Sequence, residues 1–146
     1  MRRYNDLTYE HPKLVTFTPS GLAARVAKHG KYDLIVTMSS LDHDGLGRYG
    51  DPMAPDGDLL TLDLLASVIS PSGLCFLTVP VGPDAIVWNL HRRYGPIRLP
   101  LLLEGGPWRV KKQFGFQKSL LTREADWRKT YEPVHVLSLD GSSTEL

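Results

Sequence analysis

The sequence predicts an α/β fold with an open, mostly parallel sheet, and three observations support this. Residues 32–38 and 74–79 are almost continuously apolar, which is typical of strands buried on both faces. Apolar residues at helical spacing occupy the segments between the expected strands. The order over residues 14–79 is strand, helix, strand, helix, strand, which requires crossover connections and therefore parallel pairing.

The first elements follow from local signals. Residues 14–18 (LVTFT) are expected to form a short strand. Pro19-Ser20 begins a helix that runs through Lys28, and Gly30 ends it. Residues 32–38 (YDLIVTM) then form the second strand.

A long loop is expected over residues 39–58, because five Asp, four Gly and two Pro leave no regular element there. Asp58 is expected to cap the following helix by accepting a bond from an early backbone N–H. Leucines at helical spacing continue that helix to Ile69, and residues 71–73 (PSG) end it. Residues 74–79 (LCFLTV) form the next buried strand.

The second half of the chain gives weaker signals. Residues 85–94 are predicted to form a helix, whereas 108–116 and 131–139 are predicted to be strands. One domain is therefore expected over residues 1–139, followed by a polar tail over 140–146.

Composition excludes some classes of function. The formal net charge of +1 gives no field that would steer the chain to nucleic acid or to acidic lipid. No apolar run approaches the ~20 residues of a membrane-spanning helix, and no secretory signal follows Met1. The single cysteine, Cys75, cannot form an internal disulfide, which suits a reducing compartment. We therefore expect a cytoplasmic protein with no nucleic-acid partner and no membrane span.

Two strings are specific enough to indicate a family: SSLDHDGLGRYGDP at 39–52 and WNLHRRYGPIRLPLL at 88–102. PDGDL at 55–59, LTVPVGPD at 77–84 and YEPVHVL at 131–137 accompany them. With these strings the chain resembles domain-of-unknown-function family 268 from about Tyr4 to Leu137. That family is itself similar to class I S-adenosylmethionine-dependent methyltransferases.

The resemblance implies a Rossmann-like methyltransferase-type open sheet with strand order 3-2-1-4-5-7-6 and strand 7 antiparallel. Residues 14–18, 32–38 and 74–79 would be strands 3, 4 and 5. The segments near 108–116 and 131–139 would be strands 6 and 7. The implied cofactor is S-adenosylmethionine.

The chain departs from the family pattern where the cofactor would bind. Methyltransferases of this class use a glycine-rich turn after strand 1 and an acidic residue after strand 2. Arg3 occupies the place of that acid, and the glycine turn would precede residue 1. We therefore expect a domain truncated at its N-terminus, without strands 1 and 2, and we assign no cofactor-binding residue. Strand 4 would then be an apolar edge, open to self-association.

Asp42, His43 and Asp44 are the candidate catalytic residues. They follow the strand at 32–38 directly, and ligands of open α/β sheets bind beyond the carboxyl ends of the strands. His43 would remove a proton from the acceptor, and Asp42 or Asp44 would raise its basicity. The alternative is that His43 only forms a hydrogen bond inside a folded loop.

Polar residues on the two loops after the strands are the candidate substrate-binding residues. They are Arg48, Tyr49, Asp84, Asn89, His91 and Arg92. Asn89 and His91 would hydrogen-bond a sugar or polyol, with Trp88 stacked on it. The alternatives are that Arg48 pairs with a neighbouring Asp, that Trp88 packs on the core, and that Arg92 lies on a solvated face.

No metal site is predicted, because the aspartates at 51, 56 and 58 lack the alternating oxygen ligands of a calcium loop. The resemblance implies methyl transfer from S-adenosylmethionine to a small polar acceptor, with a glycan-type hydroxyl as one candidate. The alternative is a truncated, non-catalytic remnant or an interaction module that lacks the cofactor loop. On either interpretation the chain is expected to be inactive alone.

Overall fold

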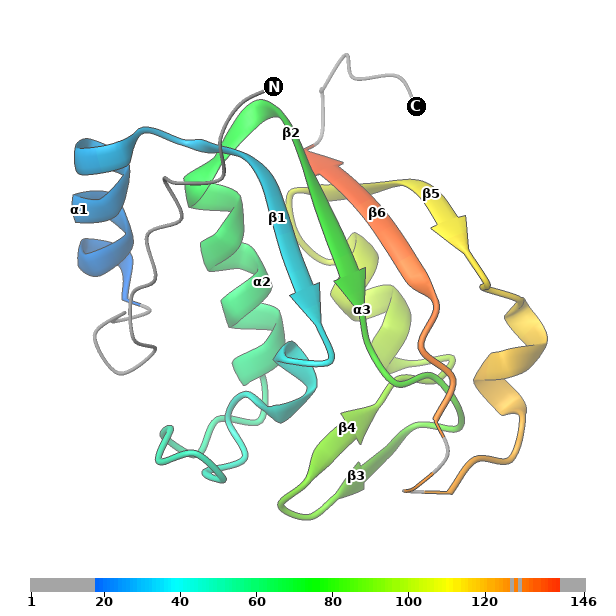
Figure 1. Cartoon of the computed structure of the whole chain (residues 1–146). Coiled ribbons are helices and arrows are strands. Elements are labelled where there is room, and N and C mark those ends of the chain that lie inside the picture. Colours follow the sequence, from blue (N-terminus) through cyan, green and yellow to red (C-terminus); the bar gives the residue numbers. More distant parts are fainter. Residues whose placement is uncertain (1–17, 127, 129, 140–146) are drawn as a thin grey trace, which may run out of the picture.

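A computed structural model describes residues 18–126, 128 and 130–139 of the chain. The strand expected at 14–18, apart from its last residue, and the tail at 140–146 lie outside the described residues. Figure 1 shows a sheet with its helices stacked behind it and a small hairpin below.

The main sheet has four strands in the order β1-β2-β6-β5. They are β1 (Tyr32–Met38), β2 (Ile69–Thr78), β5 (Trp108–Phe114) and β6 (Val134–Leu139). β1 pairs parallel with β2, and β6 lies between β2 and β5, antiparallel to both. β1 and β5 are therefore the two edge strands among the described residues.

The predicted mostly parallel, Rossmann-like sheet is wrong for this chain. Two of the three strand pairings are antiparallel, so the sheet is mixed and mostly antiparallel. The strand–helix alternation that predicted it ends at β2. Between β5 and β6 the described residues hold only a 3-10 turn at Lys118–Thr122, and a connection without a crossover helix returns the chain antiparallel.

Several local predictions for the first half agree with the structure, but the strand expected at 74–79 is part of a longer strand, Ile69–Thr78, that includes the predicted helix stop at 71–73. Helix α1 (Pro19–His29) has Pro at its start, and the Thr18 hydroxyl accepts the Gly21 N–H at 3.1 Å. Gly30 follows the helix with φ of 77°, a left-handed backbone that glycine adopts at low cost. Helix α2 (Gly57–Val68) begins close to the predicted start, and β1 has its predicted bounds.

Residues 85–94 do not form the predicted helix. They form a hairpin of β3 (Ala85–Val87) and β4 (His91–Arg93), which pair antiparallel. Both arginines of β4 bind backbone carbonyls of distant segments, and extended backbone aims them in different directions. Tertiary contacts therefore override the helical pattern here.

The core lies between the sheet and the helices α2 and α3 (Arg98–Glu104). Trp108, Leu62 and Leu77 are at most 1% exposed. The Trp108 indole N–H donates to the Leu62 carbonyl at 3.0 Å, which ties β5 to α2. Cys75 lies in the same core, and burial raises the pKa of its thiol to about 12, so it is unreactive.

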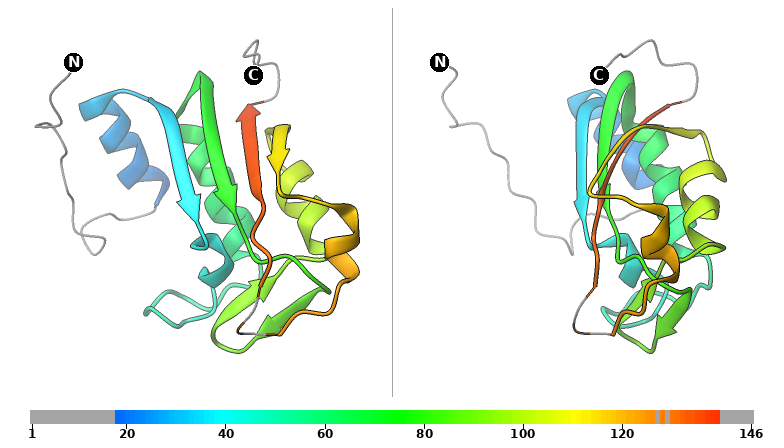
Figure 2. Two further views of the ribbon diagram at one scale, coloured as in Figure 1. Left: turned by 45° about the vertical axis from the view of Figure 1, so that its right-hand side comes forward. Right: turned by 90° about the vertical axis from the view of Figure 1, so that its right-hand side faces the viewer.

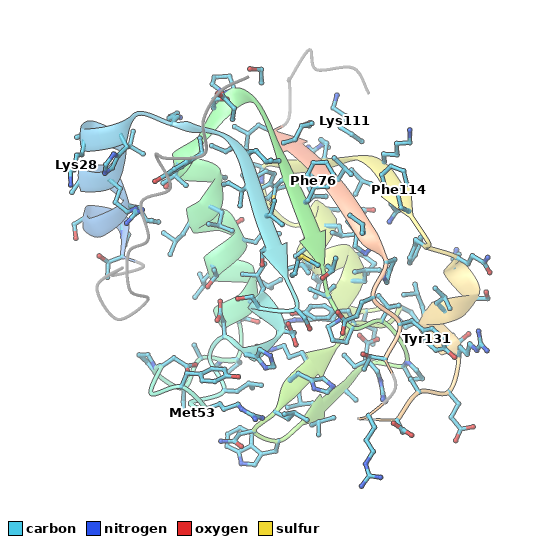
Figure 3. The ribbon with its side chains drawn as sticks, viewed as in Figure 1. Lys28, Met53, Phe76, Lys111, Phe114 and Tyr131 are labelled. Atoms are coloured by element: carbon cyan, nitrogen blue, oxygen red, sulfur yellow. The ribbon has the colours of Figure 1, made fainter. Side chains whose placement is uncertain are left out.

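The opposite face of the sheet carries none of the described helices (Figure 2). Register places Val36 of β1 beside Phe76 of β2, and Phe114 of β5 beside Val134 of β6. Val36 is 58% exposed and Phe114 49% exposed. Figure 3 labels Phe76 and Phe114 along this apolar face. None of the helices in the described part of the chain has the length and apolarity to cross a membrane.

Candidate functional site

Polar side chains gather where β1 and β2 end. Directly after β1, Ser39 has φ of 44°, a left-handed conformation that is strained for a residue with a side chain. Its N–H donates to the hydroxyl of Thr78, the last residue of β2, at 3.1 Å. This turn directs the short helix Leu41–His43 across the ends of both strands.

Asp42 is a buried carboxylate beside an accessible histidine. Its Oδ2 atom lies 3.6 Å from Nε2 of His43. The side chain of Asp42 is 1% exposed and that of His43 21% exposed. Neither carboxylate oxygen has a hydrogen-bond partner among the described residues. Burial raises the pKa of Asp42 to about 6, although the His43 ring opposes this shift.

The carbonyl of Leu90 orients the His43 ring by accepting a hydrogen bond from Nδ1. A neutral imidazole has one N–H, so a proton on Nδ1 leaves the lone pair on Nε2. Nε2 lies 3.6 Å from Oδ2 of Asp42. The arrangement can therefore accept a proton from a ligand.

His91 and Glu132 complete the polar cluster. His91 is 7% exposed, and its Nε2 has no hydrogen-bond partner among the described residues. Burial, and then His43, lower the pKa of His91, so its ring is neutral at physiological pH. Glu132 is exposed, and its Oε1 accepts bonds from the hydroxyls of Ser39 at 3.4 Å and Thr130 at 3.0 Å.

Tyr49 and Arg48 border this cluster, and the exposed residues Trp88 and Asn89 precede Leu90, whose carbonyl binds His43. The Tyr49 ring meets His43 edge-on at 5.6 Å between centroids, and the Arg48 guanidinium lies 5.7 Å from the Tyr49 centroid. Tyr49 is 71% exposed and Trp88 67% exposed. Asn89, next to Leu90, is also exposed. Five predicted residues, Asp42, His43, Arg48, Tyr49 and His91, thus belong to one region.

Arg92 is buried and binds backbone groups of the protein, so it does not lie on a solvated face. It is 2% exposed, and its guanidinium donates to the carbonyls of Asp44, Ala54 and Pro55. The guanidinium thereby fastens the loop 44–56 to β4. A ligand does not reach it in this conformation.

Asp58 does not cap α2 as predicted. It is buried between three side chains: the Tyr94 hydroxyl at 2.9 Å, the Arg98 Nη2 at 2.5 Å and the Arg92 Nε at 3.5 Å. Tertiary ion pairs have replaced the local cap, because two guanidinium groups converge on this carboxylate. Asp58 thus anchors α2 to the segment 92–98.

Asp84 organises a turn. Its carboxylate accepts backbone N–H bonds from Gly95, Ile97 and Arg98 at 2.8 to 2.9 Å. Burial alone would raise the pKa of Asp84, but these three bonds lower it. The residue holds the start of α3 rather than facing the His43 cluster.

Asp44 is separated from Asp42 and His43. It lines a trough of ≈ 690 Å³ between β1, the loop 44–54 and α2. Burial raises the pKa of Asp44, and a hydrogen bond with the Thr61 hydroxyl opposes this. Of the three predicted catalytic residues, the structure therefore brings two together.

The glycine-rich turn after β1 does not fit S-adenosylmethionine. The N–H groups of Gly45, Gly47 and Tyr49 all donate to the Asp51 carboxylate, at 2.7 to 3.1 Å. Burial would raise the pKa of Asp51, but these bonds lower it. The donors that a glycine loop offers a ligand are thus occupied by a side chain of the same loop. The described residues also hold no group of three metal-ligating side chains.

Sequence reasoning missed Glu132 as part of this region and did not predict the buried bond between Tyr94 and Asp58. Glu132 stands alone before Pro133, and an isolated Glu gives no motif. Tyr94 is completely buried with its hydroxyl on Asp58, a partner 36 residues earlier in the chain. Only the folded chain brings these groups to the site.

Comparison with protein families matches residues 4–124 to the model described as "Caenorhabditis protein of unknown function, DUF268". That description names no activity. No curated protein matches the chain.

Proposed function

The chain belongs to the DUF268 family, and we propose that it binds a small, hydroxyl-bearing ligand at the carboxyl ends of β1 and β2, where His43 accepts a proton from a ligand hydroxyl. One observation carries the proposal: a buried Asp42 carboxylate without a hydrogen-bond partner among the described residues lies 3.6 Å from Nε2 of the accessible His43. Removal of Asp42 or His43 should therefore abolish proton uptake.

The proton transfer is balanced within the pair. The ligand O–H bond breaks, a bond between the proton and His43 Nε2 forms, and the ligand keeps the electron pair on oxygen. The Leu90 carbonyl holds the Nδ1 proton throughout. Asp42 is a positioning residue, because its buried charge stabilises the imidazolium without touching the ligand.

The rim of the site supports a polyhydroxylated ligand. Tyr49 and Trp88 expose most of their rings, and aromatic faces can pack against the C–H faces of a sugar. Asn89 and Glu132 are exposed and offer hydrogen-bonding groups. Arg48, which lies over Tyr49, adds donors at the same rim.

Methyl transfer would use this proton removal, since an acceptor oxygen loses its proton as it is methylated. S-adenosylmethionine would supply the methyl group when bound. The loop 45–49 does not provide a cradle for it, because its amides bind Asp51. No step of the proposed proton transfer depends on the cofactor.

The test uses 4-nitrophenol as a hydroxyl probe whose absorbance reports proton loss. Wild-type chain at constant pH should increase the phenolate fraction saturably, whereas His43→Gln and Asp42→Asn should not. Asp63→Asn, an exposed carboxylate on α2, is the control and should behave as wild type. Equal phenolate formation by His43→Gln and wild type would exclude the proposed base.

A second measurement addresses the ligand class. Glucose, galactose, N-acetylglucosamine and glycerol are added in turn while the ring signals of His43 and His91 are followed by NMR. At least one probe should shift both rings in a saturable manner. If none does while 4-nitrophenol is deprotonated, the base stands and the polyhydroxylated class is wrong.

A further inference from the structure

The edge of β1 that faces away from β2 has no strand partner among the described residues, and it adjoins an apolar trough. Four consecutive residues of β1, Ile35 to Met38, line the ≈ 690 Å³ trough. Consecutive strand residues point to opposite faces, so a trough lined by all four wraps around the edge of the strand. Across α2, a second hollow of ≈ 730 Å³ between α1 and α2 shares Leu60 and Leu64 with the first.

The backbone of β1 has hydrogen-bonding capacity on this side. Its only strand partner among the described residues is β2, which lies on the other side. An edge strand presents a row of N–H and C=O groups that pair with an added strand. Leu34, Val36 and Met38 beside it are 55%, 58% and 70% exposed.

The two edge strands of the sheet differ in their charged residues. β5, at the far edge, carries Arg109, Lys111 and Lys112, and basic side chains are a common protection against edge-to-edge pairing. β1 contains no Lys, Arg or Pro between Tyr32 and Met38. β1 thus lacks the basic residues that protect β5, and its one charged side chain, Asp33, accepts a hydrogen bond from the Ser70 hydroxyl of the neighbouring strand β2 at 2.9 Å.

The trough also has a charge preference. Its charged lining residues are Asp44 and Asp51. Asp51 is engaged by backbone amides, whereas burial raises the pKa of Asp44, which indicates a carboxylate without full solvation. Thr37 is 9% exposed, lines the trough, and its hydroxyl has no partner among the described residues.

We propose that β1 accepts an extended segment of a second polypeptide, which adds to the sheet as a strand and places apolar and basic side chains in this trough. Backbone hydrogen bonds would supply much of the affinity, and the apolar trough with its aspartates would select the side chains. The occupant is thus a basic, apolar strand rather than a small molecule. The trough adjoins the segment that carries Asp42 and His43, since Ser40, Leu41 and Asp44 also line it, but strand addition does not depend on the proposed proton transfer.

The probe is a fluorescein-labelled peptide with the β5 sequence WRVKKQF, which is both apolar and basic. Fluorescence anisotropy should show saturable binding to the full chain, weakened by salt because the contact is partly electrostatic. The same peptide with its three basic residues changed to Glu should bind at least about tenfold more weakly, a difference of ~1.4 kcal/mol.

Val36→Lys tests the edge, because a charged side chain on an edge strand opposes pairing. Its side chain is 58% exposed, so the substitution should not unfold the chain. It should weaken peptide binding about tenfold or more, whereas Phe114→Lys on the far edge should not. Asp44→Asn, which removes a charge from the trough lining, should weaken binding several-fold.

Amide hydrogen exchange identifies the contact. Bound peptide should slow exchange of β1 amides, because their open-edge N–H groups gain partners. Absence of binding, or binding without protection of β1, would overturn the proposal. Sedimentation of the chain without peptide tests the other occupant: self-association that Val36→Lys abolishes would assign the edge to a second copy instead.

Discussion

The hydroxyl of Tyr94 donates a hydrogen bond of 2.9 Å to Oδ2 of Asp58, and both side chains are completely buried. Burial, and then the Asp58 charge, raise the pKa of Tyr94 far above its ordinary value, so the hydroxyl remains a donor. The bond joins the first turn of α2 to the end of β4. It holds in place the segment that carries His91 and the Leu90 carbonyl.

Asp58→Asn should strongly destabilise the chain. It leaves Arg92 and Arg98 without the carboxylate between them, and loss of one partner from a buried pair costs about 3–5 kcal/mol. Urea denaturation at neutral pH measures the change. The control is Asp56→Asn, which also removes a partner of Arg98 but from a 63% exposed side chain, and should cost less than about 1 kcal/mol. Equal losses would contradict the buried network.

Arg92→Lys should release the loop 44–56 from β4. A lysine ammonium lacks the planar fork that reaches the carbonyls of Asp44, Ala54 and Pro55 together. Amide exchange within the loop should accelerate. Arg93→Lys is the matched control, because Arg93 binds the carbonyls of Pro83 and Ala125 instead. Faster loop exchange in both variants would show that the anchor is not specific to Arg92.

Asp42→Asn should stabilise the chain above pH 6. The folded-state pKa of Asp42 is about 6 against an ordinary 3.8, so the folded state binds its proton more tightly, and wild type loses stability as pH rises through this window. The variant should gain on the order of 1–3 kcal/mol at pH 7, and the gain should vanish near pH 4. Denaturant titrations at both pH values check it. A pH-independent difference would mean that Asp42 titrates normally.

The buried, neutral His135 should make the folded chain less stable as the pH falls from 6.5 to 4. Burial lowers its pKa from 6.5 to about 4, so the unfolded state binds a proton more readily as pH falls from 6.5 to 4. The loss should be on the order of 2–4 kcal/mol. Asp42 changes stability in the opposite direction over the same pH range. The measurement should therefore be made on the Asp42→Asn variant. In that variant, His135→Leu should reduce the dependence of unfolding free energy on pH. His29→Gln, at an exposed position on α1, should leave that dependence unchanged.

Local sequence signals predicted the elements whose ends are marked by local chemistry. Pro19 and Gly30 bound α1, and the apolar run of 32–38 coincides with β1. The local signals gave the wrong element for residues 85–94. There the two arginines of β4 bind carbonyl acceptors in the loop 44–56 and at Ala125. Backbone acceptors in other segments leave no trace in the residue pattern, so the hairpin was not predictable.

The sequence predicted where in the sheet the candidate site lies, but only some of the residues that form it. Asp42 and His43 follow a buried strand, and the sheet places such residues at its carboxyl edge. Arg92 and Asp84 have the residue types of a binding site, yet their partners are backbone groups of the protein itself. A charged side chain looks the same in a sequence whether it binds a ligand or a loop.

The sequence by itself determined the family, the apolar strands and the polar loop that follows β1, because these depend on neighbouring residues. Only the tertiary structure decided that β6 lies antiparallel between β2 and β5, and that Asp42 is buried against His43 while Asp44 faces another trough. The physical reason is that pairing direction and burial arise from contacts between distant segments. Two aspartates separated by one residue thus acquire different surroundings when the chain folds.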